Sequence, residues 1–169
     1  MCLLFGGPEI HLESLLSETS FPSDYAPLFP DFMFLPVCIL KNEVEQVGRE
    51  LKKLKKLVQE GEGRVLSKDP RGLDQVKNEL FDLDTTHLKL RDRWLFAKGL
   101  AENLAKCFGE ISRMQGKDDG GSKPISSKIL TQRVETQITL SNMLQLDLDA
   151  IPSKIKQQHR TVQISSPRL

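Results

Sequence analysis

The sequence predicts an all-α protein, an antiparallel three-helix bundle or coiled coil with a long central helix and flexible termini. One observation is a mostly apolar row in the middle of the chain whose members alternate in steps of three and four: Leu73, Val76, Leu80, Leu83, His87, Leu90, Trp94, Ala97, Ala101, Leu104, Phe108 and Ile111. A shorter row with the same spacing precedes it: Val37, Leu40, Val44, Val47, Leu51, Leu54 and Val58. This spacing keeps one stripe of a helix facing a neighbouring helix.

Prolines and glycines divide the chain into segments. The expected segments are a Pro- and Phe-rich flexible N-terminal arm at 1–36, a helical bundle at 37–150 with helices at about 37–60, 70–114 and 126–150, and a basic disordered tail at 151–169. Five prolines in the arm bar a continuous helix there. The arm is open to two other interpretations, a docking segment whose phenylalanines fill a partner's groove and an alternative start of the chain.

Local signals set the helix boundaries. Gly61 and Gly63 are expected to end the first helix. Asp69 can cap the second helix, and Pro70 fits its first position because the first N–H groups of a helix have no partner within it. Pro152 is expected to end the third helix, since it lacks an N–H group and its ring clashes with the preceding turn.

The charge and cysteine content restrict the kind of protein. The first 40 residues carry five acidic residues and no Lys or Arg, which leaves all 24 basic residues and 18 of the 23 acidic residues in the remainder. This balance is too weak and too interspersed to predict nucleic-acid binding. The lysines of 52–56 fit a solvated helix face, with an acidic partner or membrane surface as the less favoured interpretation.

The expected location is cytoplasmic, with the nucleus as the alternative. Three cysteines without a Cys-x-x-Cys motif fit reduced intracellular thiols better than a disulfide framework. No stretch approaches the roughly 20 apolar residues needed to cross a bilayer. The amino terminus is apolar but lacks the positive region of a signal peptide. Membrane binding is therefore not expected.

The second helix carries more apolar surface than one partner needs. Phe81, Leu88 and Leu95 form a further heptad-spaced row beside the main one, which predicts a helix that lies between two neighbours. That helix would be about 65 Å long and its neighbours about 35 Å each, so part of the main row is expected to stay exposed for a partner. The expected anchors on that exposed part are Leu90, Trp94, Leu104 and Phe108.

Two side chains of the main row have alternative interpretations. His87 is expected to be partly buried and bonded across the helix interface, or to act as a pH-sensitive register device. Trp94 is expected in the core, or as a binding anchor. The sequence contains no glycine-rich phosphate loop, nucleophile elbow, His/Cys dyad or metal-ligand spacing. We therefore expect no enzyme activity and no cofactor, metal or small-molecule substrate.

Two families resemble parts of the central helix. The stretch Leu90-Arg91-Asp92-Arg93-Trp94, followed by Leu100, Leu104 and Phe108, resembles the heptads of spectrin repeats. This resemblance implies an antiparallel triple helix that serves as a cytoskeletal spacer or docking surface. The stretches Leu80-Phe81-Asp82-Leu83-Asp84 and 91–104 are similar to the last two helices of the BAG chaperone-binding bundle, which implies contacts to an Hsp70-type chaperone through Asp84 or Arg91.

The expected function is a non-enzymatic protein–protein interaction module, a scaffold or adaptor that binds a helical partner through coiled-coil surfaces. The spectrin resemblance adds an association with the cytoskeleton. The alternative is a BAG-like co-chaperone module that regulates an Hsp70-type chaperone. Self-association through the same surfaces is a third way to cover the exposed row.

Overall fold

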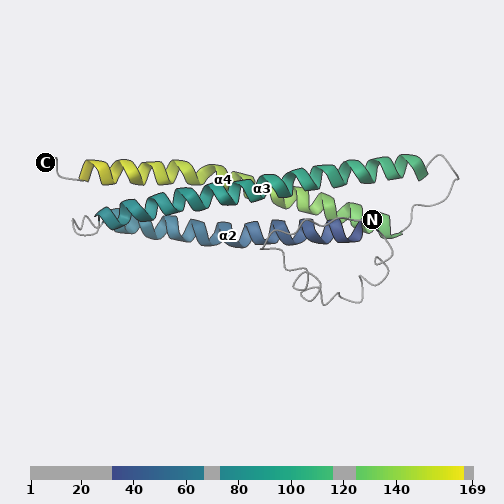
Figure 1. Ribbon diagram of the computed structural model, residues 1–169, viewed down its shortest axis with the longest axis horizontal. Coiled ribbons are helices and arrows are strands. Elements are labelled where there is room, and N and C mark those ends of the chain that lie inside the picture. Colours follow the sequence, from purple (N-terminus) through teal and green to yellow (C-terminus); the bar gives the residue numbers. More distant parts are fainter. Residues whose placement is uncertain (1–31, 67–72, 116–124, 166–169) are drawn as a thin grey trace. The chain divides into compact units, whose positions relative to one another are not determined.

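A computed structural model describes residues 32–66, 73–115 and 125–165 of the chain. These residues form three helices, α2 (Phe34–Leu66), α3 (Leu73–Gln115) and α4 (Ile125–Ser165), and no strand occurs among them (Figure 1). The predicted all-α three-helix bundle is confirmed. The predicted central helix at 70–114 agrees with α3 to within three residues.

The helices contribute to two compact units. Among the described residues, the first unit contains 32–42, 100–115 and 125–137, and the second contains 43–66, 73–99 and 138–165. Each unit is built from one segment of each of the three helices. A hydrophobic core therefore forms within each unit from α2, α3 and α4.

In the second unit α3 runs antiparallel to α2. Arg93 contacts Glu43 and Glu50 through its two terminal nitrogens, each at 3.0 Å. Arg64, near the end of α2, forms an ion pair of 2.8 Å with Glu79 near the start of α3. Residues late in α2 thus lie beside residues early in α3, which defines opposite directions.

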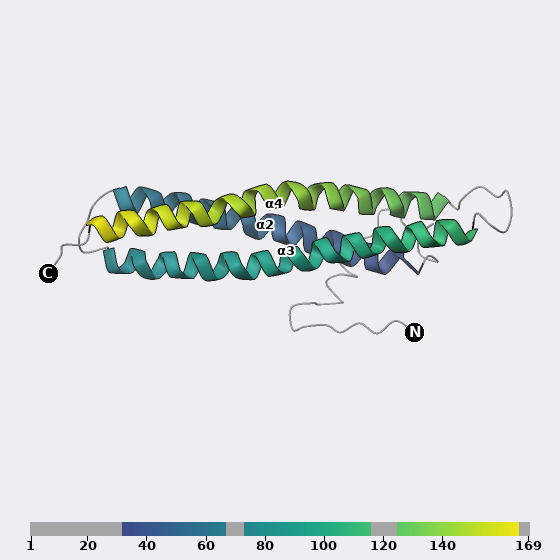
Figure 2. The same ribbon diagram turned by 90° about the horizontal axis from the view of Figure 1, so that it is seen from above.

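The third segment of the second unit, from α4, is antiparallel to α3 and parallel to α2 (Figures 1 and 2). Trp94 Nε1 donates to the carbonyl of Ser141 at 2.9 Å, while His87, earlier in α3, bonds the carbonyl of Leu148, later in α4. On the α2 side, Lys55 binds Asp147 at 2.9 Å. This is the up-down-up order that short connections favour.

Most of the core residues that α2 and α3 contribute to the two units belong to the two heptad-spaced rows. In the second unit the buried cluster from α2 and α3 contains Val47, Leu51, Leu54, Val58, Val65, Val76, Leu80, Leu83, Leu90 and Trp94. In the first unit the buried apolar residues are Met33, Phe34, Val37, Leu40, Ala101, Leu104, Phe108, Leu130 and Val134. The main row of α3 therefore contributes buried residues to the cores of both units.

The first helix is longer than predicted at both ends. It begins at Phe34, so that Pro36 occupies its first turn, where a missing N–H group costs nothing. It also continues through Gly61 and Gly63 to Leu66, which contradicts the predicted end near residue 60. Each helical glycine costs about 1 kcal/mol against alanine, but the extension buries Val65, and burial of an aliphatic side chain contributes about 1.5–3 kcal/mol.

The third helix contradicts the prediction most strongly. α4 passes through Pro152 and ends at Ser165, so residues 151–165 are helical and not a disordered tail. Pro152 has no N–H group, which leaves the carbonyl of Leu148, four residues earlier, without its helical donor. His87 Nε2 lies 2.9 Å from that carbonyl oxygen and supplies the hydrogen bond from α3.

Burial accounts for the rest of the extension. Ile151, Ile155 and Val162 are buried in the core of the second unit. At about 1.5–3 kcal/mol per buried aliphatic side chain, their contribution exceeds the roughly 3 kcal/mol by which proline is less favourable than alanine in a helix.

Several predictions fall on residues that the structure does not describe. The arm is described only from residue 32 onward, and the predicted cap formed by Asp69 and Pro70, residues 116–124 between the second and third helices and the last four residues lie outside the described ranges. Among the described helices, none has an apolar stretch long enough to span a lipid bilayer.

Candidate interaction surface

The four predicted anchors lie in the core of the protein. Their exposed fractions are 2% for Leu90, 5% for Trp94, 5% for Leu104 and 3% for Phe108. The main row of α3 is buried from Val76 to Phe108, because segments of α2 and α4 accompany α3 in both units. This corrects the prediction that the four side chains anchor a partner, since none of them is accessible in the folded chain.

His87 and Trp94 connect α3 to α4 by the same kind of contact. His87 is 5% exposed, and its Nε2 must carry the hydrogen because a carbonyl oxygen only accepts. Trp94 follows His87 by one heptad, and its acceptor Ser141 precedes Leu148 by one heptad. Two buried hydrogen bonds with matched spacing fix the register of α3 against α4. The expected bond from His87 across the helix interface is confirmed.

A third buried hydrogen bond connects α4 to α2. Gln158 Nε2 donates to the carbonyl of Val58 at 2.8 Å, and Gln158 is 5% exposed. A Cβ atom on Gly61 would approach Gln158 Oε1 to 3.2 Å. Gly61 therefore gives the Gln158 amide room, a packing role that spacing alone does not reveal.

The row Phe81, Leu88 and Leu95, here called the outer row, faces solvent. The exposed fractions of these side chains are 68%, 58% and 49%. The sequence identified the row but predicted that a neighbouring helix would contact it, and among the described residues no helix covers it. Three large apolar side chains at seven-residue steps lie along one face of α3, in contrast to the single exposed apolar residues that are common on proteins.

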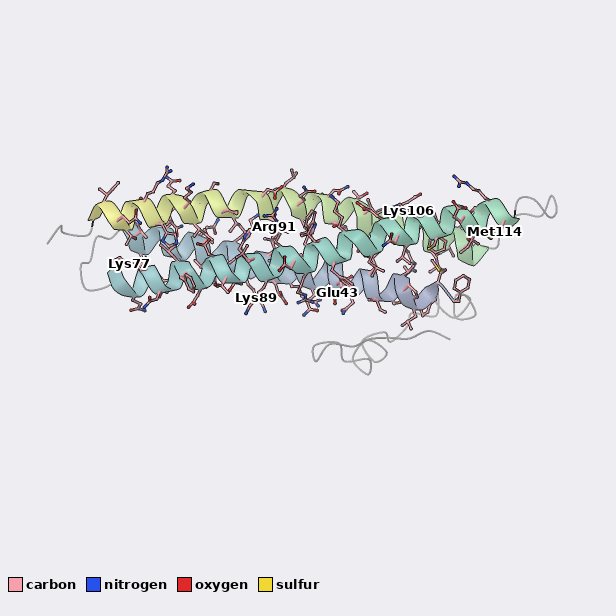
Figure 3. All side chains as sticks on the ribbon, turned by 45° about the horizontal axis from the view of Figure 1, so that its top comes forward. Glu43, Lys77, Lys89, Arg91, Lys106 and Met114 are labelled. Atoms are coloured by element: carbon pink, nitrogen blue, oxygen red, sulfur yellow. The ribbon has the colours of Figure 1, made fainter. Side chains whose placement is uncertain are left out.

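The residues between the members of the outer row are suited to a contact. Thr85, between Phe81 and Leu88, turns its hydroxyl back to the carbonyl of Phe81 at 3.0 Å, which satisfies the hydroxyl within its own helix. Lys89 and Arg91 lie on opposite edges of α3 (Figure 3). Both are exposed, so the apolar stripe is bordered by charge on each side.

The lysine cluster of α2 is a solvated surface with local partners. Lys55 binds Asp147, and Lys56 lies 3.7 Å from Glu60 one turn later on the same helix. Lys52 and Lys53 are exposed. Acidic side chains of this chain thus compete for the cluster, which weakens the case for an acidic external partner there.

A cleft of the second unit lies between α2 and α3. It has a volume of about 260 Å³ and is bordered by Leu57, Gly61, Val76 and Leu83, with the Arg64–Glu79 ion pair at its edge. Elsewhere in the described ranges, no three His, Cys, Asp or Glu side chains are grouped closely enough to hold a metal ion.

The two cysteines of the described residues differ in environment. Cys38, in the first unit, is partly buried, and burial raises the pKa of its thiol, an effect that the positive charges of Arg133 and Lys41 partly offset. Cys107 is exposed. The raised pKa keeps Cys38 as the unreactive thiol over a wider pH range.

We expect Cys107 to react with a chromogenic disulfide reagent at least about tenfold faster than Cys38 at pH 8, because each unit of raised pKa lowers the thiolate fraction about tenfold and burial restricts access. The measurement uses the Cys2→Ser chain, with Cys38→Ser and Cys107→Ser variants to assign each phase. The rate for Cys38 should continue to increase with pH. Equal rates for both thiols would contradict the burial of Cys38.

Comparison with known proteins adds no family. No protein-family model, curated protein or solved structure matches this chain. The spectrin and BAG resemblances therefore stay predictions from short stretches of sequence. For the second of these, Leu73–Gln115 is one uninterrupted helix, whereas the resemblance implies two helices that meet at a turn.

Proposed function

We propose that this chain is a non-enzymatic interaction module, a scaffold or adaptor in the cytoplasm that binds a helical protein partner. The observation that carries the proposal is the outer row of α3. Phe81, Leu88 and Leu95 remain in contact with solvent although the adjacent main row of the same helix is buried. The contact surface proposed here thus replaces the four buried anchors predicted from the sequence.

The outer row has the dimensions of a helix-docking stripe. From Phe81 to Leu95 it extends about 21 Å at 1.5 Å per residue, or four turns of helix. A partner helix with apolar residues at alternating steps of three and four can place its side chains between those of the row. Full burial of three such side chains contributes roughly 5–9 kcal/mol before the cost of association is subtracted, which suits reversible binding.

Replacing Phe81, Leu88 and Leu95 together with serine is expected to weaken partner binding at least about a hundredfold while the chain stays folded, because the replaced side chains are exposed. The partner is first identified with a photo-cross-linking amino acid at position 88. It is then purified, and its binding is measured by isothermal titration calorimetry against the wild-type and triple-serine chains.

The matched control replaces three exposed apolar residues of α4 with serine: Met143, Leu146 and Ile164, whose exposed fractions are 62%, 75% and 85%. This control chain should bind the partner as tightly as wild type. The proposal is refuted if the purified partner binds the outer-row variant and the wild-type chain with equal affinity.

A further inference from the structure

We propose that the part of α4 in the second unit, 138–165, is a releasable segment that leaves the core as one piece while α2 and α3 stay paired. Its release uncovers the apolar face of α2 and α3 that α4 covers in the closed state. The inference goes beyond the proposed function, because it does not involve the outer row. It rests on the buried polar atoms, the apolar burial and the ion pairs of the second unit.

Two polar atoms of the releasable segment are buried without a hydrogen bond. Among the described residues, neither Ser141 Oγ nor Gln158 Oε1 has a hydrogen-bond partner, and the two residues are 1% and 5% exposed. A similar atom of α3, Glu79 Oε2, lies 2.8 Å from the positive charge of Arg64. A buried polar atom without a partner has lost its hydrogen bonds to water and gained none in exchange. Release of α4 returns Ser141 Oγ and Gln158 Oε1 to water, which lowers the cost of opening.

Pro152 acts in the same direction. The carbonyl of Leu148 has no donor within α4, so in the closed state it depends on His87 Nε2 at 2.9 Å. Water can donate to this carbonyl once α4 has left the core. The segments 43–66 of α2 and 73–99 of α3 contain no proline. The helix with the interrupted hydrogen-bond ladder is therefore the one that separates most readily.

The releasable segment also buries fewer apolar side chains than its two neighbours. Among the described residues it contributes Leu148, Ile151, Ile155 and Val162 to the buried apolar residues of the second unit. Those of the other two segments are Val44, Val47, Leu51, Leu54, Val58 and Val65 from α2 and Val76, Leu80, Leu83, Leu90, Trp94 and Ala97 from α3. The hydrophobic contribution grows with the apolar area removed from water, so the docking of α4 is supported by less burial.

Ion pairs hold α2 and α3 together independently of α4. Arg93 of α3 contacts Glu43 and Glu50 of α2 at 3.0 Å each. The Arg93 side chain is 24% exposed and that of Glu43 is 11% exposed, so solvent screens this contact only weakly. Arg64 and Glu79 link the same two helices nearer the end of α2. All three contacts stay intact when α4 leaves.

The ion pairs of the releasable segment are more exposed. Asp147 contacts Lys55 of α2 at 2.9 Å, and His159 lies 3.4 Å from Asp84 of α3. Both side chains of each pair are partly exposed, and His159 carries its charge only when it is protonated. Exposed pairs contribute little to stability. The charges of the second unit therefore favour the pair of α2 and α3 over the docking of α4.

The test is native-state hydrogen exchange of the full chain, followed by mass spectrometry at urea concentrations below the unfolding transition. Peptides within 138–165 are expected to exchange through an opening at least about tenfold more populated than the one that exposes the most protected peptides of 43–66 and 73–99. Exchange of the α4 peptides should also depend less on urea, because release of one helix exposes less surface than unfolding of all three.

Two substitutions test the order of the steps. Glu50→Gln weakens the contact with Arg93, so it should lower the protection of α2 and α3 about fivefold and leave that of α4 unchanged, since this contact survives the release. Ser141→Ala removes a buried atom without a partner and should raise the protection of all three segments at least about fivefold. The matched control, Ser153→Ala at an exposed position of α4, should raise it only about twofold through helix preference.

The exchange pattern decides the inference. Release of α4 is supported if its peptides exchange first and are unaffected by Glu50→Gln. Exchange of all three helices through one opening at every urea concentration overturns it. So does exchange of α2 or α3 before α4, or a loss of protection in Glu50→Gln that is equal in all three helices. None of these results bears on the outer row, so the proposed function is tested separately.

Discussion

Trp94→Ala is expected to lower the free energy of unfolding by about 3–5 kcal/mol, the usual cost of removing a large buried aromatic side chain. The indole is 5% exposed, and its Nε1 donates to the carbonyl of Ser141 at 2.9 Å. The substitution removes the packing of the ring and the hydrogen bond to α4 together. Domains of this kind have a total stability of roughly 5–15 kcal/mol, so the loss is a large fraction of it.

The measurement is urea denaturation followed by far-ultraviolet circular dichroism, because the variant lacks the fluorescent indole. Phe96→Ala, which removes an aromatic ring two residues away that is 56% exposed, is the control and should change stability by no more than about 0.5 kcal/mol. Trp94→Phe should have an intermediate effect of about 1 kcal/mol or somewhat more, since it keeps most of the burial and loses the hydrogen bond. Equal stabilities for Trp94→Ala and Phe96→Ala would contradict the buried position of Trp94.

His87→Leu is expected to cost about 1–3 kcal/mol, although leucine matches the apolar surroundings of the row. The physical reason is the carbonyl of Leu148. Pro152 has no N–H group to donate to this carbonyl within the helix, and His87 Nε2, at 2.9 Å, donates to it instead. Without the imidazole this buried carbonyl would have no donor. The measurement is again urea denaturation, here of the single variants and of the double variant with Pro152→Ala.

Pro152→Ala provides the second arm of a double-mutant cycle. Alanine returns an N–H group to position 152, so that the carbonyl of Leu148 can accept within its own helix. We therefore expect His87→Leu to cost about 1–2 kcal/mol less in the Pro152→Ala chain than in wild type. Lys154→Ala, at an exposed position of the same helix, is the control background, and there His87→Leu should cost as much as in wild type. Additive effects of His87→Leu and Pro152→Ala would refute the coupling.

This contact gives His87 a structural role that follows from the chemistry of proline. An imidazole on an apolar row resembles a metal ligand or a pH switch. Here it donates a hydrogen bond to the carbonyl of Leu148, 61 residues later in the chain, which has no donor within its own helix. Trp94, one heptad after His87, donates to the carbonyl of Ser141, one heptad before Leu148. Buried polar side chains of this kind favour one register of packing over its neighbours, because a shifted register would leave donors and acceptors unpaired.

Part of the candidate surface can be read from the sequence. The seven-residue spacing identifies Phe81, Leu88 and Leu95 as one stripe of α3. The spacing does not show whether a helix of the same chain covers the stripe. That depends on the side of α3 on which α4 packs, which periodicity along one helix does not encode.

The sequence by itself determined that three helices form and which stripe of the first two enters the core, because the alternation of three- and four-residue steps is a local property of each segment. It also identified His87 as a buried side chain bonded across a helix interface. Only the tertiary structure decided where the helices end and which apolar residues stay in water. Gly61, Gly63 and Pro152 are breakers when judged by local preference, yet α2 and α4 continue through them. The local cost is outweighed by a hydrogen bond from a distant residue and by the burial of four side chains, Val65, Ile151, Ile155 and Val162. Neither contribution can be predicted from the residues next to the breakers in the sequence.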